Sequence, residues 1–512
     1  MIRRYLYDLP LIVTLMGVAA LSMLLPAVFA GVSGDPFTGR VFLYGGVVLS
    51  FLVVLLAIAT HRPSRNETRA LRSETSLLPL AFAYFLLPVI FAIPFFEAVR
   101  NTTFLNAYVE MVSSFTTTGM TLYPDPDRLS PSLHLWRAQV GWMGGFFIWT
   151  SALAVFAPLN LGGFEVSSRS TAGQIDTHFT QIERQFNLVE RFSRYGGMLF
   201  PIYVTITAIL WLSLLFLGDT PFVALCHAMS TIATSGISPI GGLENANSGL
   251  LGEGAVFLFF IFALTRVLYM KSQSEDLFIR LKEDPELRLS LLIIVLTSLF
   301  LFLRHWFASL EFESKASLMD TFHAIWGSVF TVASFLTTTG FESADWSLAR
   351  AWSGLPTPGL ILVGLSMIGG GIATTAGGVK LLRVYALYQH SRREMDRLSH
   401  PHAIGGVGQT KRHFRRQGAV IAWIFFMLFA MTLALFVVLF SATGMPFEAA
   451  IITSSAMLTN AGPLVEVALA EPLNLEAFGA GNKWALILAM IIGRIETLAL
   501  VALLNPIYWR KA

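Results

Sequence analysis

Four short segments of the chain combine hydroxyl or amide side chains with a glycine, a composition that suits coordination of alkali cations. They read Thr116-Thr117-Thr118-Gly119, Ala233-Thr234-Ser235-Gly236, Thr337-Thr338-Thr339-Gly340 and Thr459-Asn460-Ala461-Gly462. Glycine adopts backbone angles that other residues resist, so such a strand can turn its carbonyl oxygens toward an axis. Four strands around one axis would form rings of oxygens that replace the hydration shell of a cation.

Each of these segments follows an apolar stretch that is too short to span a membrane. The four stretches are 104–115, 221–233, 321–336 and 446–458. A hydrocarbon core of ~30 Å needs roughly 20 helical residues. We therefore expect half-helices that enter the membrane and stop, because backbone that leaves helical form at that depth is tolerated only where it is buried or lines a water-filled path.

The rest of the composition belongs to a helical membrane protein. Of the 512 residues 54% are hydrophobic and 13% charged, and the mean hydropathy is +0.65, whereas a soluble domain has about 25% charged residues. Full-length apolar runs fall near 9–31, 41–60, 76–97, 135–158, 196–217, 253–271, 289–310, 356–388, 417–441 and 483–505. We predict an all-α polytopic membrane protein. The single cysteine, Cys226, excludes an internal disulfide framework, and the absence of phosphate-binding and dinucleotide-binding motifs argues against an ATP-driven pump.

The repeating unit is a span, a half-helix, a glycine-terminated loop and a second span. It occurs four times after an additional pair of spans. The predicted boundaries are 1–75 for the N-terminal hairpin, 76–194 for repeat 1, 195–287 for repeat 2, 288–415 for repeat 3 and 416–512 for repeat 4.

The positive charges predict the orientation. Most of the 35 Lys and Arg residues fall on one side if the N-terminus is cytoplasmic, in Arg3 and Arg4, in 62–72, 169–194, 271–288 and 380–416, and in Arg510 and Lys511. The positive-inside rule then places both termini in the cytoplasm. The opposite loops are rich in acidic residues: Asp125, Asp127, Asp219, Glu244, Glu253, Glu311, Glu313, Glu342, Asp345, Glu466, Glu471 and Glu476. Such a vestibule would concentrate cations.

A second motif lies inside the span after the third loop. It reads Gly369-Gly370-Gly371-Ile372-Ala373-Thr374-Thr375-Ala376-Gly377-Gly378-Val379-Lys380. Five glycines in ten residues oppose a stable lipid-facing helix, because each costs up to about 1 kcal/mol relative to alanine. One interpretation is a kinked helix packed closely through small residues. The interpretation we favour is an unwound loop beneath the four glycine-terminated loops.

Arg494 is the third feature with a chemical meaning. At 1.5 Å per residue it lies roughly 16 Å beyond Lys483, near the middle of the bilayer. An arginine at that depth costs at least ~2.5 kcal/mol unless it faces water or a partner. It could be a structural residue paired with Glu496 or with a helix end. We favour a position in the pore below the loops, where it would oppose cation flow and hold the glycine-rich loop shut. For Arg266 and Glu496 we expect structural salt bridges.

With these motifs the sequence resembles the Trk/Ktr/HKT superfamily of cation transporters, and within it the TrkH branch. The resemblance runs from about residue 76 to 506, and the hairpin at 9–60 is similar to the additional N-terminal spans of that branch. Ser113 to Gly119 resembles the first filter of the family, Thr337 to Phe341 the third, and Asn460 to Pro463 the fourth. The glycine-rich tract resembles the intramembrane gate, and Gly493 to Glu496 resembles the segment of the pore arginine. Two positions depart from the family pattern, where Leu464 and Ala373 replace glycines.

The resemblance implies gated potassium uptake across the bacterial inner membrane by a homodimer, with a cytosolic nucleotide-binding, TrkA-like regulatory ring. It implies no organic cofactor and no nucleic-acid partner. The residues expected to bind K⁺ in the filter are Thr117, Thr118, Gly119, Thr234, Ser235, Gly236, Thr338, Thr339, Gly340, Asn460, Ala461 and Gly462. The residues expected to form the gate are Gly369, Gly370, Gly371, Thr374, Thr375, Gly377, Gly378, Lys380 and Arg494.

Other functions remain open from the residues alone. Rings of carbonyls do not by themselves settle the ion, so a sodium-conducting or H⁺- or Na⁺-coupled cation transporter is the alternative; four filter glycines, none replaced by serine, favour potassium by resemblance. Coupling would call for carboxylates at mid-membrane, and Glu496 is the strong candidate. A membrane-embedded enzyme would need a convergent catalytic set in the spans, and the sequence offers none, so we do not expect an enzyme.

Overall fold

The computed structural model describes residues 9–60, 77–166, 188–269, 277–309, 318–353, 359–399, 416–469 and 473–497. All regular secondary structure within these ranges is helical. Among the described residues, seven helices are long and apolar enough to cross a membrane: Leu11–Val32, Pro36–Thr60, Leu77–Ala98, Pro131–Leu159, Leu188–Phe216, Pro285–Leu303 and Gly418–Ala442. The prediction of an all-α polytopic membrane protein is confirmed.

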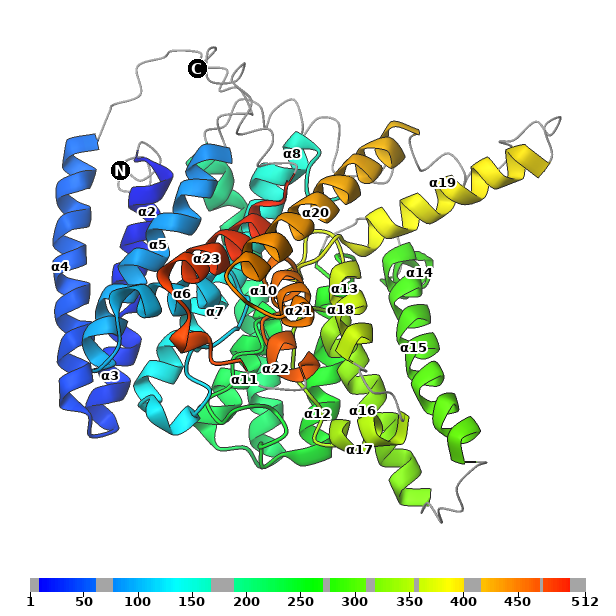
Figure 1. Cartoon of the computed structure of the whole chain (residues 1–512). Helices are drawn as coiled ribbons and strands as arrows, with labels where there is room; N and C mark the ends of the chain where they lie inside the picture. The colour runs from blue at the N-terminus through cyan, green and yellow to red at the C-terminus, as the bar shows by residue number, and fades with distance from the viewer. Residues whose placement is uncertain are drawn as a thin grey trace.

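The N-terminal hairpin packs on the outside of the helical body. It consists of α2 (Leu11–Ser22), α3 (Leu24–Val32) and α4 (Pro36–Thr60). The hairpin lies against α5 (Leu77–Ala98) and α7 (Pro131–Ser151), and α4 forms one edge of the molecule (Figure 1). Large apolar side chains of α4 such as Val48, Phe51 and Ile58 are exposed, as expected of a helix that faces lipid.

The four predicted half-helices are present at nearly the predicted places. They are α6 (Phe104–Phe115), α11 (Pro221–Ala233), α16 (Leu318–Leu336) and α21 (Phe447–Thr459). Each stands between two other helices, giving α5–α6–α7 in repeat 1, α10 (Leu188–Phe216)–α11–α12 (Gly249–Phe259) in repeat 2, α15 (Pro285–Ser309)–α16–α18 (Gly359–Ile368) in repeat 3 and α20 (Arg416–Ala442)–α21–α23 (Ala480–Ile495) in repeat 4. The expected order of span, half-helix, loop and span is therefore observed four times.

Further helices connect these elements, and all of them except α19 are short. They are η2 (Pro126–Arg128), the π-helical turn η3 (Ala152–Phe156), α8 (Ala157–Leu159), α13 (Ile261–Leu264), α14 (Leu277–Glu283), α17 (Trp346–Ser353), α19 (Leu381–Ser399), α22 (Leu464–Ala468) and η5 (Leu475–Ala477). A π-helical turn leaves one carbonyl out of the regular ladder and is frequent at functional sites. This one extends α7 toward the glycine-rich loop.

The second spans of repeats 2, 3 and 4 are shorter than predicted. The helical part of 253–271 ends with α13, and the span 356–388 is divided into α18 and α19. In repeat 4, α23 ends at Ile495, and Glu496 has a φ of 68° that no longer fits a helix; residues 498–505 of that predicted span lie outside the described ranges. These breaks converge on the glycine-rich loop, which replaces helical hydrogen bonds by contacts between repeats.

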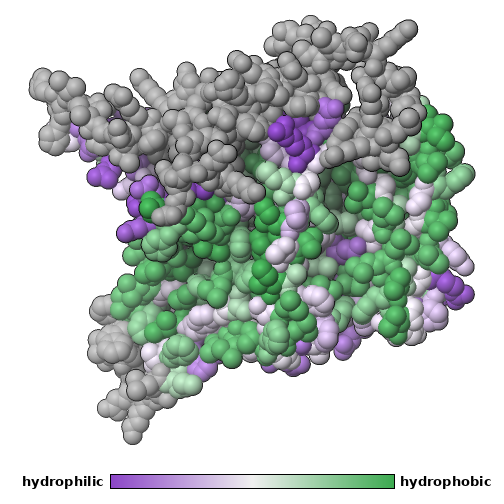
Figure 2. All heavy atoms as spheres, turned by 180° about the vertical axis from the view of Figure 1, so that it is seen from behind, coloured by the Kyte–Doolittle hydropathy of each residue, from purple (hydrophilic) through white to green (hydrophobic). Residues whose placement is uncertain are grey.

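The surface is arranged as a membrane requires. A broad band of hydrophobic residues crosses the face shown in Figure 2, with hydrophilic residues gathered mainly above and below it. In Figure 1 the basic element α19 lies in the upper half of the molecule, α14 lies at the upper end of α15 near the start of α19, and α17 lies toward the lower end. Of the predicted cytoplasmic charges, Arg3 and Arg4, 62–72, 169–187, 271–276, 400–415, Arg510 and Lys511 lie outside the described residues.

Candidate functional site: a ring of four loops over a glycine-rich loop

The four loops share one unusual backbone conformation. The residue two places before each glycine has a positive φ: 53° at Thr117, 51° at Thr234, 57° at Thr338 and 53° at Asn460. This left-handed conformation costs roughly 1–2 kcal/mol for a residue with a side chain. Its recurrence at four equivalent positions means that the surroundings impose the same turn on every loop.

A second set of equivalent contacts fixes these turns. The next amide in each loop donates to the carbonyl five residues earlier in the half-helix, with distances of 2.8 Å from Thr118 to Ser113, 2.9 Å from Ser235 to Ser230, 2.9 Å from Thr339 to Ser334 and 2.9 Å from Ala461 to Ala456. Each half-helix thus ends in the same hydrogen-bonded cap. The four-fold pattern in the sequence corresponds to four copies of one local structure.

The loops form a closed ring in chain order. A Cβ atom on Gly119 would collide with the Ser235 carbonyl, and one on Gly236 would collide with the Thr339 carbonyl. Gly340 lies against the side chain of Pro463. The Gly462 amide closes the ring by donating to the Thr118 carbonyl at 2.6 Å. Glycine is required at these positions because the neighbouring backbone leaves no room for a side chain.

The fourth loop departs from the other three. Gly119, Gly236 and Gly340 have positive φ, whereas Gly462 does not. The chain then turns directly into α22, which begins at Leu464, the residue that stands where the family pattern has glycine. Pro463, just before it, would lie 2.8 Å from a Cβ atom on Gly236 or on Gly340. The ring is therefore only pseudo-symmetric, and its fourth quarter is more rigid than the other three.

Below the ring, residues 369–380 leave helical form, so the interpretation as a continuous kinked helix is wrong. The Gly371 amide donates to the Ala263 carbonyl at 2.9 Å, and the Leu381 amide donates to the Gly370 carbonyl at 2.9 Å. A Cβ atom on Gly377 would collide with the Thr459 carbonyl at the end of α21. Several glycines are thus used for close backbone approach.

Together with Arg494, the glycine-rich loop reaches the inner end of every half-helix. The Thr375 hydroxyl donates to the Ile232 carbonyl of α11 at 3.1 Å. The Gly377 amide, which packs on α21, donates to the Thr338 hydroxyl beyond α16 at 2.7 Å. The contact with the first repeat is made through Arg494, which donates to the Thr116 carbonyl. The loop therefore contacts three quarters of the ring directly and the first quarter through Arg494.

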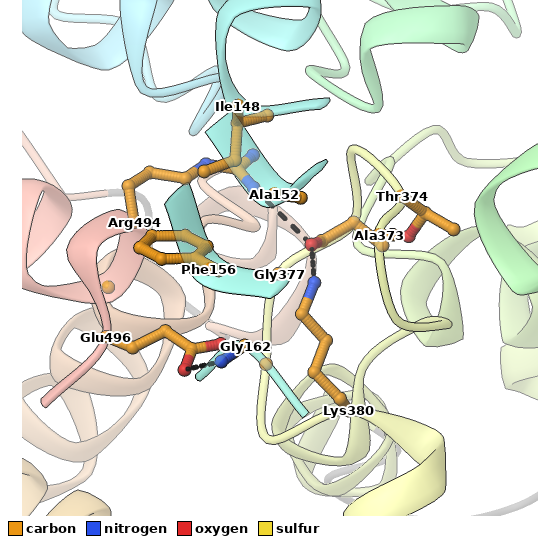
Figure 3. A pocket seen from close by; sticks show the side chains of 13 residues that line it. Ile148, Ala152, Phe156, Gly162, Ala373, Thr374, Gly377, Lys380, Arg494 and Glu496 are labelled. Atoms are coloured by element: carbon orange, nitrogen blue, oxygen red, sulfur yellow. Dashed lines mark hydrogen bonds between the residues drawn. The ribbon is translucent and has the colours of Figure 1, made fainter. Parts of the chain in front are cut away.

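Arg494 lies between the ring and the glycine-rich loop. It is 3% exposed, and its Nη1 atom donates to the carbonyls of Thr375 at 2.7 Å and Ala376 at 3.4 Å. Lys380 donates to the same Ala376 carbonyl from the other side, so the two cations converge on one oxygen (Figure 3). The Nη2 atom of Arg494 has no hydrogen-bond partner within the described ranges.

A small cavity of about 30 Å³ adjoins Arg494. Arg494, Lys380 and Glu496 line it together with the π-helical turn of repeat 1 (Figure 3). Its size suits a single water molecule, since one probe sphere needs ~10–15 Å³. A hydrated cation does not fit into a space of this size.

Glu496 does not pair with Arg494, so that half of the structural alternative is wrong. The other half, a contact with a helix end, is observed, because Arg494 donates to the carbonyl of Thr116 at the C-cap of α6. It pairs with Arg383 of α19 at 2.8 Å, and Arg383 also binds Glu165 at 2.6 Å. This ion triad is buried, with Arg383 fully inaccessible to solvent. The expectation of a structural salt bridge at Glu496 is confirmed. Arg266, for which the same was expected, lies over the Phe164 ring at 5.5 Å. Arg383 was missed because it follows Lys380 in a basic stretch that the charge pattern assigns to the cytoplasm.

The opposite mouth of the ring carries acidic groups. A cavity of about 430 Å³ is lined by Glu342, Glu466 and Arg350 among other residues. Burial, with the neighbouring carboxylates of Glu244 and Glu466, raises the pKa of Glu342 to about 7. These residues match the predicted acidic vestibule.

Not every predicted vestibule residue faces that mouth. Asp219 is buried and accepts a hydrogen bond from the Ser248 amide at 2.8 Å. Glu253 is buried against the strand that leaves the third loop. Glu311, Glu313 and Glu471 lie outside the described residues.

Comparisons with known proteins agree with this geometry. A family of cation transport proteins, TrkH, matches residues 257–508. The Trk system potassium uptake protein TrkH of Halomonas elongata is 30% identical over 91% of this chain and 93% of its own length. That of Salmonella typhimurium is 28% identical over 96% of both chains. The crystal structure of the potassium transporter TrkH from Vibrio parahaemolyticus superposes with a TM-score of 0.78 and 27% identity, covering 100% of both chains.

Proposed function

Because the chain belongs to the TrkH family of cation transport proteins, we propose that it takes up potassium through a central pore whose selectivity filter is the ring of four loops. The relatives at this level of identity are named potassium uptake proteins, and the alignment with each covers nearly its whole length. The alternatives of sodium conduction and of H⁺- or Na⁺-coupled transport remain outcomes of the experiment below.

One observation carries the proposal: the four loops adopt the same left-handed turn and close into one ring in chain order. A ring of strands at membrane depth is the structure that offers several oxygens to one dehydrated cation. The inner ends of four half-helices also meet here, and their partial negative charge favours a cation on the axis. In this proposal K⁺ is the transported ion, held in the filter by Thr117, Thr118, Gly119, Thr234, Ser235, Gly236, Thr338, Thr339, Gly340, Asn460, Ala461 and Gly462.

The gate of the pore is the glycine-rich loop with Arg494. Support comes from the contacts that the loop and Arg494 together make with all four half-helices and from the cavity beneath, which admits about one water. The guanidinium adds a positive charge to the ion path. Opening requires Arg494 to release the carbonyls of Thr116 and Thr375, so that the loop withdraws from the axis. The gate residues are Gly369, Gly370, Gly371, Thr374, Thr375, Gly377, Gly378, Lys380 and Arg494.

The surrounding assembly follows from the same proposal. The protein lies in the bacterial inner membrane with both termini in the cytoplasm, in agreement with the common end of α14 and α19 in Figure 1. It works as a homodimer, and a nucleotide-binding TrkA-like ring docks on its cytoplasmic side. The repeats 76–194, 195–287, 288–415 and 416–512 are the units that build the pore, and the hairpin 1–75 is an additional unit outside it.

The test is uptake of radioactive rubidium, a stand-in for potassium, into liposomes that hold the purified chain. Block by excess external potassium and not by sodium is the expected result. Equal block by both ions would retain the pore and refute potassium selectivity, and a dependence on a proton or sodium gradient would favour a coupled transporter. No uptake by the wild type or by Arg494→Ala would refute the pore itself.

A further inference from the structure

Each half-helix carries a polar residue at the same register, nine positions before the glycine of its loop. These four residues are Glu110, His227, Thr331 and Thr453. Glutamate, histidine and threonine differ in chemistry, so this repeat cannot be recognised from the residue types in the sequence. All four side chains are buried at the level of the ring. A polar side chain in such a place needs a hydrogen-bond partner.

Three of them find that partner in the segment that follows the glycine of the same loop, which we call the outgoing strand. Glu110 accepts a hydrogen bond from the Leu122 amide at 2.8 Å. Thr331 accepts one from the Ser343 amide at 3.4 Å. Leu122 and Ser343 both stand three residues after their glycine, so the contacts are equivalent. Each ties the outgoing strand to its half-helix.

The second repeat makes the same connection by another route. The residue three places after Gly236 is Pro239, which has no amide hydrogen to donate. His227 instead bonds the hydroxyl of Ser238 at 2.9 Å through its Nε2 atom. A carboxylate at position 227 would have no amide to accept from, because Pro239 stands at the equivalent place, whereas the histidine ring bonds the Ser238 hydroxyl. This explains why the residue type changes while the connection remains.

The fourth repeat shows what happens without the connection. The Thr453 hydroxyl has no partner within the described part of the chain. Its outgoing strand is the first turn of α22, in which the Val465 amide donates to the Gly462 carbonyl at 3.0 Å. A helical turn satisfies its own backbone, so this strand needs no tie to the half-helix.

Glu110 is the strongest of the ties. Its carboxylate lies 2.7 Å from the Arg137 guanidinium of α7, and both side chains are buried. A charged acceptor strengthens the bond to the Leu122 amide, and Arg137 balances the charge. In the third repeat, where Thr331 makes a long bond, a second carboxylate supplements it: Glu253 of α12 accepts from the Ala344 amide at 2.6 Å.

We propose that Glu110, held by Arg137, is a positioning residue that sets the width of the filter by anchoring the strand after Gly119, and that His227 has the same role in the second repeat. This inference rests on the proposed filter function. The anchor acts behind the ring, so its loss should let the strand move outward and relax the discrimination between potassium and sodium.

The experiment compares four variants in the rubidium uptake assay: Glu110→Leu, His227→Phe, Thr453→Val and the double variant Glu110→Gln with Arg137→Gln. The readout is the ratio of sodium to potassium concentrations that halve uptake. Removing a buried hydrogen bond to a charged group should lower this ratio by about tenfold in Glu110→Leu. His227→Phe should lower it by less, because its bond is to a neutral hydroxyl.

Two variants serve as controls. Thr453→Val removes the unbonded hydroxyl at the equivalent position and should leave the ratio unchanged. The double variant keeps an amide oxygen for the Leu122 amide without an unpaired charge, so it should recover part of the selectivity that Glu110→Leu loses. A purely structural residue would change the amount of folded protein without changing the ratio.

The outcomes separate this inference from the proposed function. If the wild type itself does not discriminate between the two ions, the filter proposal fails. If the wild type discriminates and both Glu110→Leu and His227→Phe retain its ratio, the anchoring role is refuted. If Glu110→Leu does not fold, His227→Phe decides, and an unchanged ratio in that variant would overturn the inference.

Discussion

Replacing Arg494 with alanine should increase cation flux through the isolated chain. The guanidinium joins the glycine-rich loop to the first half-helix through the carbonyls of Thr375, at 2.7 Å, and Thr116. A hydrogen bond from a charged donor contributes roughly 1.5–3 kcal/mol. At the lower value, two bonds stabilise the closed arrangement by about 3 kcal/mol. Because 1.4 kcal/mol is a factor of ten, the open fraction should rise by about a hundredfold.

The assay is the initial rate of rubidium uptake into liposomes that contain equal amounts of folded wild type and variant. Lys483→Met is the matched control. Lys483 stands on the same helix, α23, and its ammonium donates to the Glu476 carbonyl at 2.7 Å, at the other end from the glycine-rich loop. It removes one cation and one carbonyl contact without touching the gate, so its rate should equal that of the wild type.

A rate for Arg494→Ala within about twofold of the wild type would refute the reasoning. An increase in both variants would point to a general effect of positive charge on α23. Shortening 370–377 offers an independent check, because a loop that cannot reach the half-helices should also raise the rate. If that change abolishes uptake in folded protein, the loop supports the pore and does not close it.

Three further predictions concern the ring, its mouth and the glycine-rich loop. Gly340→Ser should reduce potassium preference in the competition assay, because its Cβ atom would lie 2.8 Å from the Pro463 ring at a φ of 86°; unchanged preference in folded protein would contradict the role of Gly340. Since the pKa of Glu342 is raised to about 7, its carboxylate is charged above that pH and neutral below it. Uptake at low rubidium should thus fall as external pH drops from about 8 to about 6, and Glu342→Gln should flatten the profile; a pH dependence that persists in this variant would exclude Glu342 as its source. Ala373→Gly should raise the melting temperature by a few degrees, because Ala373 has a φ of 56° that costs roughly 1–2 kcal/mol with a side chain; a lower melting temperature would mean that flexibility of the open loop outweighs the strain.

The local elements of this protein were predictable because hydrophobicity and chain length decide them. The half-helices at 104–115 and 221–233 match α6 and α11 to the residue. Membrane spans are long uninterrupted apolar runs, and a run that is too short cannot cross. The second spans were harder to predict. The apolar run 253–271 does not remain helical to its end, because the backbone at Thr265 turns to meet the glycine-rich loop and residues 283–286.

The candidate site was predictable in its residue types and incompletely in its contacts. The repeated glycine-terminated loops and Arg494 were identified because each violates what a lipid-facing helix allows. The partner of Arg494 was not decided by the sequence: Glu496 is two residues away and pairs with Arg383, which stands 113 residues earlier in the chain. Such pairs follow from packing between repeats, which leaves no periodic signal.

The sequence by itself determined that this is a membrane protein with four half-helices, each followed by a loop of glycine and hydroxyl residues. These features depend on local composition and on the thickness of a bilayer. Only the tertiary structure decided that the loops close in chain order, that the fourth is stiffened by Pro463 and α22, and that Glu110 and His227 do one job with different chemistry. The reason is physical: a buried polar group is satisfied by whichever donor or acceptor the fold brings within about 3 Å, and that neighbour is a property of the packed molecule.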